Sequence, residues 1–140
     1  MSNAIEFFIP LLPATALSPN GNRQHWSKVS AARKELREAT AWLAPPGSVM
    51  AAQLPIDPAR VTLTCRQTRR KPRDGRYRPR DIPNATFALK PVYDGIQDAG
   101  LIVDDTADHL PEAVVRIEWI EEYRDEGIHV LVEPAGGDDG

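Results

Sequence analysis

The chain has 140 residues, of which 41% are hydrophobic and 26% are charged, and its formal net charge is −3. This length and this balance are typical of one globular domain, and they exclude a chain that is disordered throughout. The longest apolar stretch, residues 7–17, is interrupted by Pro10 and Pro13 and is shorter than the roughly 20 apolar residues of a membrane-spanning helix.

The N-terminal residues and the cysteine content favour a cytoplasmic location. The chain begins without the basic segment and the uninterrupted apolar segment of a secretory signal peptide. Cys65 is the only cysteine, which excludes an internal disulfide bond and a metal site made of cysteines alone. We therefore expect a cytoplasmic protein with no membrane partner.

The first third of the chain predicts a strand, a loop and a helix. Residues 5–12 are rich in Phe, Ile and Leu and predict a strand that ends near Pro13. Residues 17–23 contain Pro-Asn-Gly, a strong turn signal. An amphipathic helix is predicted from about residue 27 or 30 to residue 44, where Pro45-Pro46-Gly47 terminates it. Its apolar positions recur at steps of three and four: Val29, Ala32, Leu36, Ala39 and Leu43.

The next strand is predicted at residues 60–66, where apolar and polar residues alternate strictly. Val61, Leu63 and Cys65 fall on one side of this strand and threonines on the other. Residues 66–80 then show no apolar periodicity and contain two prolines and a glycine. We expect that segment to form an exposed loop.

Residues 84–99 predict a second helix, with Gly100 as its C-terminal cap. Pro91 falls within this segment, and proline in a helix interior removes a backbone hydrogen bond and clashes with the preceding turn. The regular helix therefore either begins at about Lys90 or is kinked there.

Two alternating segments near the C-terminus predict a β-hairpin. They span residues 113–122 and 128–133 and surround the turn signal Asp-Glu-Gly at 125–127. Trp119 in this hairpin and Trp42 in the first helix lie on apolar faces, so we expect both in the core.

The order strand, helix, strand, helix, strand, strand predicts an α+β fold. We expect a single domain over residues 1–134, in which one mixed β-sheet packs against two helices. Residues 135–140 have nothing to pack against and are expected to form a disordered acidic tail.

Basic charge is concentrated in one segment. Residues 66–80 hold eight of the 17 basic residues and one acidic residue, so they carry +7 and the rest of the chain carries −10. Such a division favours a localised anionic partner, and nucleic-acid phosphate is the partner that we expect, the alternative being a merely solvated loop. Tyr77 in this segment can stack on an unpaired base. The side chains expected to bind DNA are Arg69, Arg70, Lys71, Arg73, Arg76, Arg78 and Arg80.

Carboxylates follow the basic segment and a short apolar run. Lys90 and Asp94 are four residues apart, so a helix places them on one face, where such a pair is commonly a solvated ion pair. If Asp81 and the pair Asp104-Asp105 lie at the rim of one sheet, they form an oxygen-ligand site suited to Mg²⁺. The alternative is that Asp81 caps a helix and Asp104-Asp105-Thr106 forms a turn.

Other common chemistries lack their motifs. The three histidines do not have the spacing of zinc ligands, and Cys65 has no cysteine or histidine at ligand spacing. The glycines form no phosphate-binding loop, and no serine stands in a nucleophile elbow. A zinc site, nucleotide hydrolysis and a serine nucleophile are therefore not indicated.

The residues around the acidic cluster resemble the core motif of the RusA-type Holliday junction resolvases. Three stretches carry the resemblance: Arg80-Asp81-x-x-Asn84, Lys90, and Asp94-Gly95-Ile96-Gln97-Asp98-Ala99-Gly100-Leu101-Ile102-Val103-Asp104-Asp105. Leu17-Ser18-Pro19-Asn20 also resembles the family's N-terminal loop, so the similarity is spread over most of the chain. The resemblance implies a RusA-like fold and an Mg²⁺-dependent endodeoxyribonuclease. Such an enzyme acts as a homodimer on branched DNA, the four-way junction, in recombination and repair.

The resemblance also implies roles for individual residues. Asp81 matches the family's first metal-binding aspartate, and Lys90 matches its active-site lysine. Asp105 matches the last metal-binding aspartate, with Asp104 beside it as a further metal ligand. Pro83 stands where the family has its second aspartate, so one of three acidic ligands is missing.

Two other functions are compatible with the sequence. Because of Pro83, the protein is alternatively a catalytically weakened RusA-like protein that only binds branched DNA. The basic segment alone is also compatible with an interaction module that binds RNA or an acidic protein.

Overall fold

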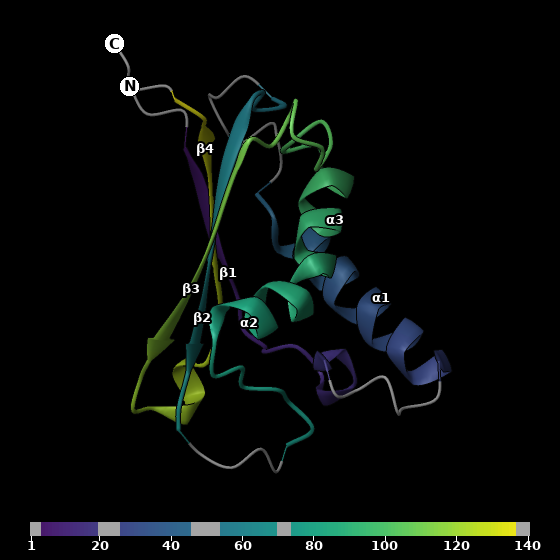
Figure 1. Ribbon diagram of the computed structural model, residues 1–140, viewed down its shortest axis with the longest axis vertical. Coiled ribbons are helices and arrows are strands. Elements are labelled where there is room, and N and C mark those ends of the chain that lie inside the picture. The colour runs from purple at the N-terminus through teal and green to yellow at the C-terminus, as the bar shows by residue number, and fades with distance from the viewer. Residues whose placement is uncertain (1–3, 20–25, 46–53, 70–73, 137–140) are drawn as a thin grey trace.

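The computed structural model of the chain describes residues 4–19, 26–45, 54–69 and 74–136. Four strands and three α-helices form its framework, together with two short 3₁₀ turns (Figure 1). In chain order these elements are β1 (Ile5–Ile9), the turn η1 (Thr15–Leu17), α1 (Trp26–Leu43), β2 (Ala59–Gln67), α2 (Ile82–Ala88), α3 (Lys90–Asp98), β3 (Glu112–Trp119), the turn η4 (Tyr123–Asp125) and β4 (Gly127–Pro134).

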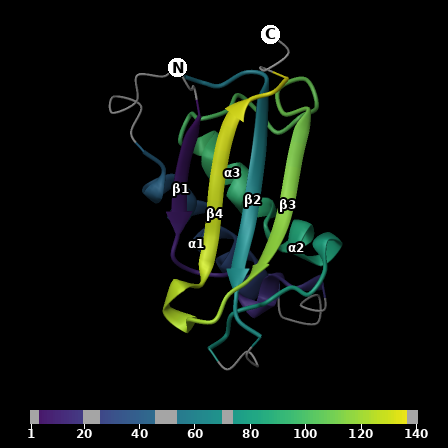
Figure 2. The ribbon, with the colours of Figure 1, turned by 90° about the vertical axis from the view of Figure 1, so that its left-hand side faces the viewer.

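The strands form one mixed sheet, and the helices cover one of its faces. The strand order is β1-β4-β2-β3, with β2 and β3 parallel and the other pairs antiparallel. Figure 1 shows the sheet edge-on with the helices on one side, and Figure 2 shows the opposite face of the sheet, which none of the helices in the described ranges covers. The α+β class and the mixed sheet are therefore confirmed.

The predicted C-terminal hairpin is wrong. β4 lies between β1 and β2, whereas β3 lies at the sheet edge and pairs in parallel with β2 (Figure 2). The physical reason is burial: Ile128, Val130 and Val132 are completely buried and need neighbours on both sides, while β3 is exposed along much of its length. The parallel pairing requires the long helical connection that α2 and α3 provide.

The break between α2 and α3 resolves the expectation about Pro91. Leu89 separates the two helices, and Pro91 lies in the first turn of α3, where its missing N–H group costs no intrahelical hydrogen bond. A regular helix thus begins at Lys90, and the described residues form three α-helices where we expected two. Pro83 lies in the first turn of α2, where its missing N–H group likewise costs no intrahelical hydrogen bond.

The core lies between the sheet and the helices. Leu36 of α1 and Ile96 of α3 are completely buried, as is Leu63 of β2. Gly95 permits the close approach of the two helices, because a Cβ atom there would lie 2.5 Å from Thr40 Cβ. Within the parts of the chain that the structure describes, no helix is long and apolar enough to cross a membrane.

Both tryptophans that we expected in the core are at the surface. Trp42 is 87% exposed, because the buried face of α1 consists of Ala32, Leu36 and Thr40 and Trp42 lies outside it. Trp119 is 36% exposed, because it ends the edge strand β3. The predicted acidic tail is described only at residues 135 and 136, and its remainder lies outside the described residues.

Candidate functional site

Asp81 caps the N-terminus of α2. Its Oδ1 accepts a hydrogen bond from the backbone N–H of Asn84 at 2.9 Å, and its Oδ2 accepts one from Asn84 Nδ2 at 3.0 Å. This is the helix-capping alternative that the sequence left open. The side chain is nevertheless exposed and lines a cavity.

Lys90, Asp94 and Asp105 form one charged cluster. Lys90 Nζ donates hydrogen bonds to Asp105 Oδ2 at 2.6 Å and to Asp94 Oδ1 at 3.2 Å. Asp104 supports the cluster, because its Oδ1 accepts the backbone N–H of Asp105 at 2.6 Å. The structure thus brings together Lys90, Asp104 and Asp105 and confirms the contact between Lys90 and Asp94 that their spacing predicted.

The ion pair shifts the protonation of both partners toward their charged forms. The hydrogen bond from Lys90 lowers the pKa of Asp105 below its usual value, although partial burial acts in the opposite direction. The hydrogen bond to Asp105 raises the pKa of Lys90, again against partial burial. At neutral pH the cluster therefore contains the Lys90 ammonium group and the ionised Asp105 carboxylate, and the Lys90 side chain is 59% exposed to solvent.

The carboxylates of this cluster have the donor chemistry of an Mg²⁺ site. Mg²⁺ binds oxygen ligands and commonly takes one or two carboxylates from a protein. Asp94 and Asp105 converge on one point, and the ammonium group of Lys90 occupies that point. Among the described residues, no group of three or more His, Cys, Asp or Glu side chains is close enough to hold a metal ion. The predicted set of Asp81, Asp104 and Asp105 therefore does not form such a group, and the Lys90 ammonium group lies between the Asp94 and Asp105 carboxylates.

The basic segment is partly a structural element. Arg78 is buried, and its guanidinium donates to Glu126 Oε1 at 2.6 Å, to Glu126 Oε2 at 2.8 Å and to Asp74 Oδ2 at 2.9 Å. Thr68 also donates to Glu126, through its backbone N–H at 2.6 Å and its hydroxyl at 2.9 Å. The expectation of an exposed loop is therefore wrong at Arg78, because the buried carboxylate of Glu126 needs a cationic partner.

Hydrogen bonds decide the charge of that buried carboxylate. Burial acts to raise the pKa of Glu126, but the hydrogen bonds from Arg78 and Thr68 outweigh it and hold the pKa below its usual value of 4.5. Arg76 is held in a similar way at the surface, by an ion pair with Glu35 of α1 at 2.8 Å. Two of the arginines expected to bind DNA thus anchor the segment to the rest of the fold.

Two further described arginines of the segment line a cavity of about 850 Å³. Arg69 and Arg80 are exposed there, and Tyr77 and Trp119 supply aromatic surface. The guanidinium of Arg69 lies over the Trp119 ring, 4.0 Å from its centroid. Asp81 belongs to the same wall, so a predicted catalytic carboxylate lies among cationic and aromatic side chains. Arg70, Lys71 and Arg73 lie outside the described residues.

A second cavity, of about 600 Å³, adjoins the Lys90 cluster. Lys90 and Asp94 contribute to its wall together with Arg33 and the exposed ring of Phe87. Ser18 and Pro19 line it too, so the loop that resembles the family's N-terminal loop lies near Lys90.

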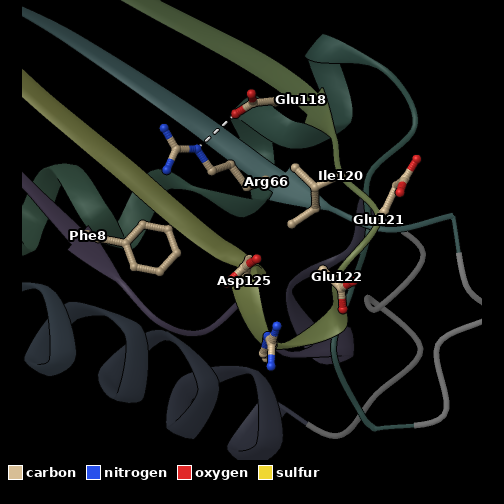
Figure 3. Close-up of a pocket in the computed structure, with 8 residues that line it drawn as sticks. Phe8, Arg66, Glu118, Ile120, Glu121, Glu122 and Asp125 are labelled. Atoms are coloured by element: carbon tan, nitrogen blue, oxygen red, sulfur yellow. Dashed lines mark hydrogen bonds and ion pairs between the residues drawn. The ribbon is translucent and has the colours of Figure 1, made fainter.

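A third cavity, of about 420 Å³, lies at the end of the sheet between the turn η4 and the strand β2 (Figure 3). Arg66 donates to Glu118 there at 2.8 Å, and the ring of Phe8 lies 5.8 Å from the Arg66 guanidinium. The lining holds two arginines against four carboxylates. This surplus of negative charge does not favour phosphate, whereas arginines line both cavities to which α2 residues contribute.

The comparisons with known proteins add no relative. No protein-family model matches the chain, and no curated protein matches it. The family motif and the geometry described above are therefore the observations on which a function can be proposed.

Proposed function

We propose that this protein is a RusA-type endodeoxyribonuclease that binds branched DNA as a homodimer and nicks it in the presence of Mg²⁺. The observation that carries the proposal is the cluster in which Lys90, from the start of α3, donates to Asp105 at 2.6 Å across fifteen residues of sequence. These two residues match the active-site lysine and the last metal-binding aspartate of the family motif. Their approach is what a shared active site requires.

Phosphodiester cleavage needs positive charge where negative charge develops on the phosphate. Lys90 provides such a charge, and its raised pKa keeps the ammonium group protonated at neutral pH. A divalent cation held by Asp94 and Asp105 would supply a polarised phosphate oxygen and an activated water. In this structure Asp105 and Asp94 hold the Lys90 ammonium group between them, so a bound cation would displace that group toward the phosphate.

The cationic cavity supplies the attraction that the acidic cluster lacks. Asp94, Asp104 and Asp105 on their own would repel a DNA backbone. Arg69 and Arg80 line the cavity that also contains Asp81, and Arg33 lines the cavity that contains Lys90. Both predicted catalytic regions therefore have an arginine within their own cavity to hold a phosphate.

Nicking of a synthetic four-way junction tests the proposal. We expect paired nicks in the junction that require Mg²⁺, disappear with EDTA and are absent from a matched linear duplex. Asp105→Asn should abolish nicking while junction binding is kept. Asp98→Asn is the matched control, because Asp98 lies on α3 and its hydrogen bonds at 2.6 and 2.8 Å are to Arg37, which is not a hydrogen-bond partner of Lys90 or Asp105. Wild-type nicking rates in both Asp105→Asn and Asp81→Asn would contradict the assigned site.

A second candidate function is binding of branched DNA without cleavage. The observation that favours it is the Lys90 ammonium group at the point where Asp94 and Asp105 converge, together with the proline at position 83. The result expected for this candidate is a shifted but uncut junction in Mg²⁺, with cleavage gained in Pro83→Asp. Rapid cleavage by the wild-type protein would eliminate it. Equal affinity for duplex DNA, junction and RNA would instead favour an interaction module.

A further inference from the structure

Trp119 and Arg69 form a stacked pair whose position is fixed by strand pairing. Trp119 ends β3 and is paired with Gln67, the last residue of β2. Arg69 follows two residues later, and its guanidinium lies 4.0 Å from the Trp119 ring centroid. Trp119 keeps 36% of its surface exposed, so the pair presents a flat aromatic and cationic surface to the cavity.

The rest of the cavity is built on anchored groups. The backbone N–H of Tyr77 donates to the Pro13 carbonyl at 2.7 Å, which fixes this part of the segment against the chain after β1. Arg78 is held by Glu126 and Asp74. Burial raises the pKa of Tyr77 and the nearby charge of Asp81 raises it further, so the phenol stays neutral. The cavity therefore exists before a ligand arrives, which lowers the entropy cost of binding.

The lining selects a ligand that is both aromatic and anionic. Arginine outnumbers carboxylate in the wall, which favours phosphate, and the rings of Tyr77 and Trp119 favour a flat partner. A nucleotide combines both properties, since every base has a face that stacks on aromatic side chains and on guanidinium planes. A volume of about 850 Å³ is within the range of sites for small molecules, whereas a paired DNA arm needs an open surface.

We propose that this cavity holds one unpaired nucleotide of DNA, with its base stacked on the Trp119–Arg69 pair and its phosphate beside Arg80. The inference rests on the proposed function and deepens it: the feature recognised in branched DNA is a base that has left the helical stack at the branch. Asp81 lies in the same cavity, so the unpaired nucleotide is held next to a predicted catalytic carboxylate.

Trp119 fluorescence tests the inference directly. The chain has three tryptophans, so a Trp26→Phe/Trp42→Phe variant leaves Trp119 as the single reporter. The probes are a continuous DNA duplex, the same duplex with a one-nucleotide bulge, and that duplex with an abasic nucleotide in the bulge. We expect quenching of Trp119 by the bulged base and much less quenching by the other two DNAs. In the otherwise wild-type protein, Trp119→Ala should weaken binding of the bulged DNA about 5- to 150-fold and leave duplex binding within about 2-fold.

Two further variants separate stacking from folding. Trp42→Ala removes another exposed tryptophan, from α1, and should leave all three affinities unchanged. Trp119→Phe keeps an aromatic ring and should retain most of the preference for the bulged base. This variant also serves if Trp119→Ala fails to fold. Equal quenching by the base and the abasic bulge, or an unchanged preference for the bulged base in a folded Trp119→Ala variant, overturns the inference. If the inference about the unpaired nucleotide is overturned but the protein still nicks the four-way junction, the proposed function stands. If the protein binds none of the DNAs, both the inference and the proposed function are refuted.

Discussion

The buried ion pair between Arg78 and Glu126 allows a quantitative test of the fold. The side chains of Arg78 and Glu126 are only 5% and 7% exposed. Of the hydrogen bonds to the Glu126 carboxylate described above, Arg78→Ala leaves those from Thr68. Removing one partner of a buried pair costs about 3–5 kcal/mol, because the remaining charge is left uncompensated. A domain of this size has a free energy of unfolding of about 5–15 kcal/mol, so the substitution removes a large part of it.

Urea unfolding followed by circular dichroism measures this effect. The control is Arg66→Ala, which breaks an Arg–Glu pair of similar length, 2.8 Å to Glu118, whose side chains are 40% and 52% exposed. That exposed pair should contribute less than about 1 kcal/mol. If Arg78→Ala does not fold, Arg78→Lys should still unfold at lower urea than Arg66→Ala, because lysine keeps the charge but loses the forked donor geometry. Equal stabilities of the Arg78 and Arg66 variants would refute the argument.

Three further predictions concern titration, reactivity and packing. The pKa of Glu126 in the folded protein lies below 4.5, so its ionised carboxylate stabilises the fold above that pH and this stabilisation is lost as the pH falls through the folded pKa. Urea titrations between pH 7 and 3 should show the resulting fall in the free energy of unfolding, and Glu126→Gln should show a smaller fall. Burial raises the pKa of Cys65 to about 12, so iodoacetamide should modify it slowly in buffer and rapidly in urea, and fast native labelling would contradict its burial. Gly95→Ala should lower stability by about 1–3 kcal/mol through the clash with Thr40, and an unchanged melting temperature would argue against that packing.

Local patterns predicted most elements of the fold but not how the strands pair. Alternation located β2 and β4, and the steps of three and four located α1, within a few residues of their observed ends. Alternation does not say which neighbour a strand takes. The strand at Gly127–Pro134 is central because three of its side chains must be covered from both sides, and that requirement depends on β1, more than a hundred residues away in sequence.

Because local patterns do not show long-range contacts, only some of the site residues could be predicted from the sequence. Lys90 and Asp94 share a helix face, so their contact follows from spacing, and the motif pointed to Asp105. Arg78 and Arg80 are two residues apart in one basic segment and look alike in sequence, yet one is buried and the other exposed. The difference comes from Glu126, 48 residues farther on, whose burial cannot be read from local composition. Trp119 was predicted to lie in the core because an apolar residue on an alternating strand is usually buried, and its place at the end of an edge strand leaves it 36% exposed.

Asp81 and Lys90 line two different cavities near opposite ends of α2, and mapping of the nick positions can tell which of them lies next to the cleaved bond. α2 has seven residues, so it rises about 10 Å from the Asp81 end to the Lys90 end. Successive nucleotides of one strand are spaced by about 3.4 Å along the helix axis, so a strand that follows α2 spans about three nucleotides between the two ends. If Asp81 directs cleavage, the nick should lie next to an unpaired base placed in the junction; if the Lys90–Asp105 cluster directs it, the nick should lie about three nucleotides away. A sequencing gel resolves the two positions, and nicks with no fixed offset from the unpaired base would contradict a strand path along α2.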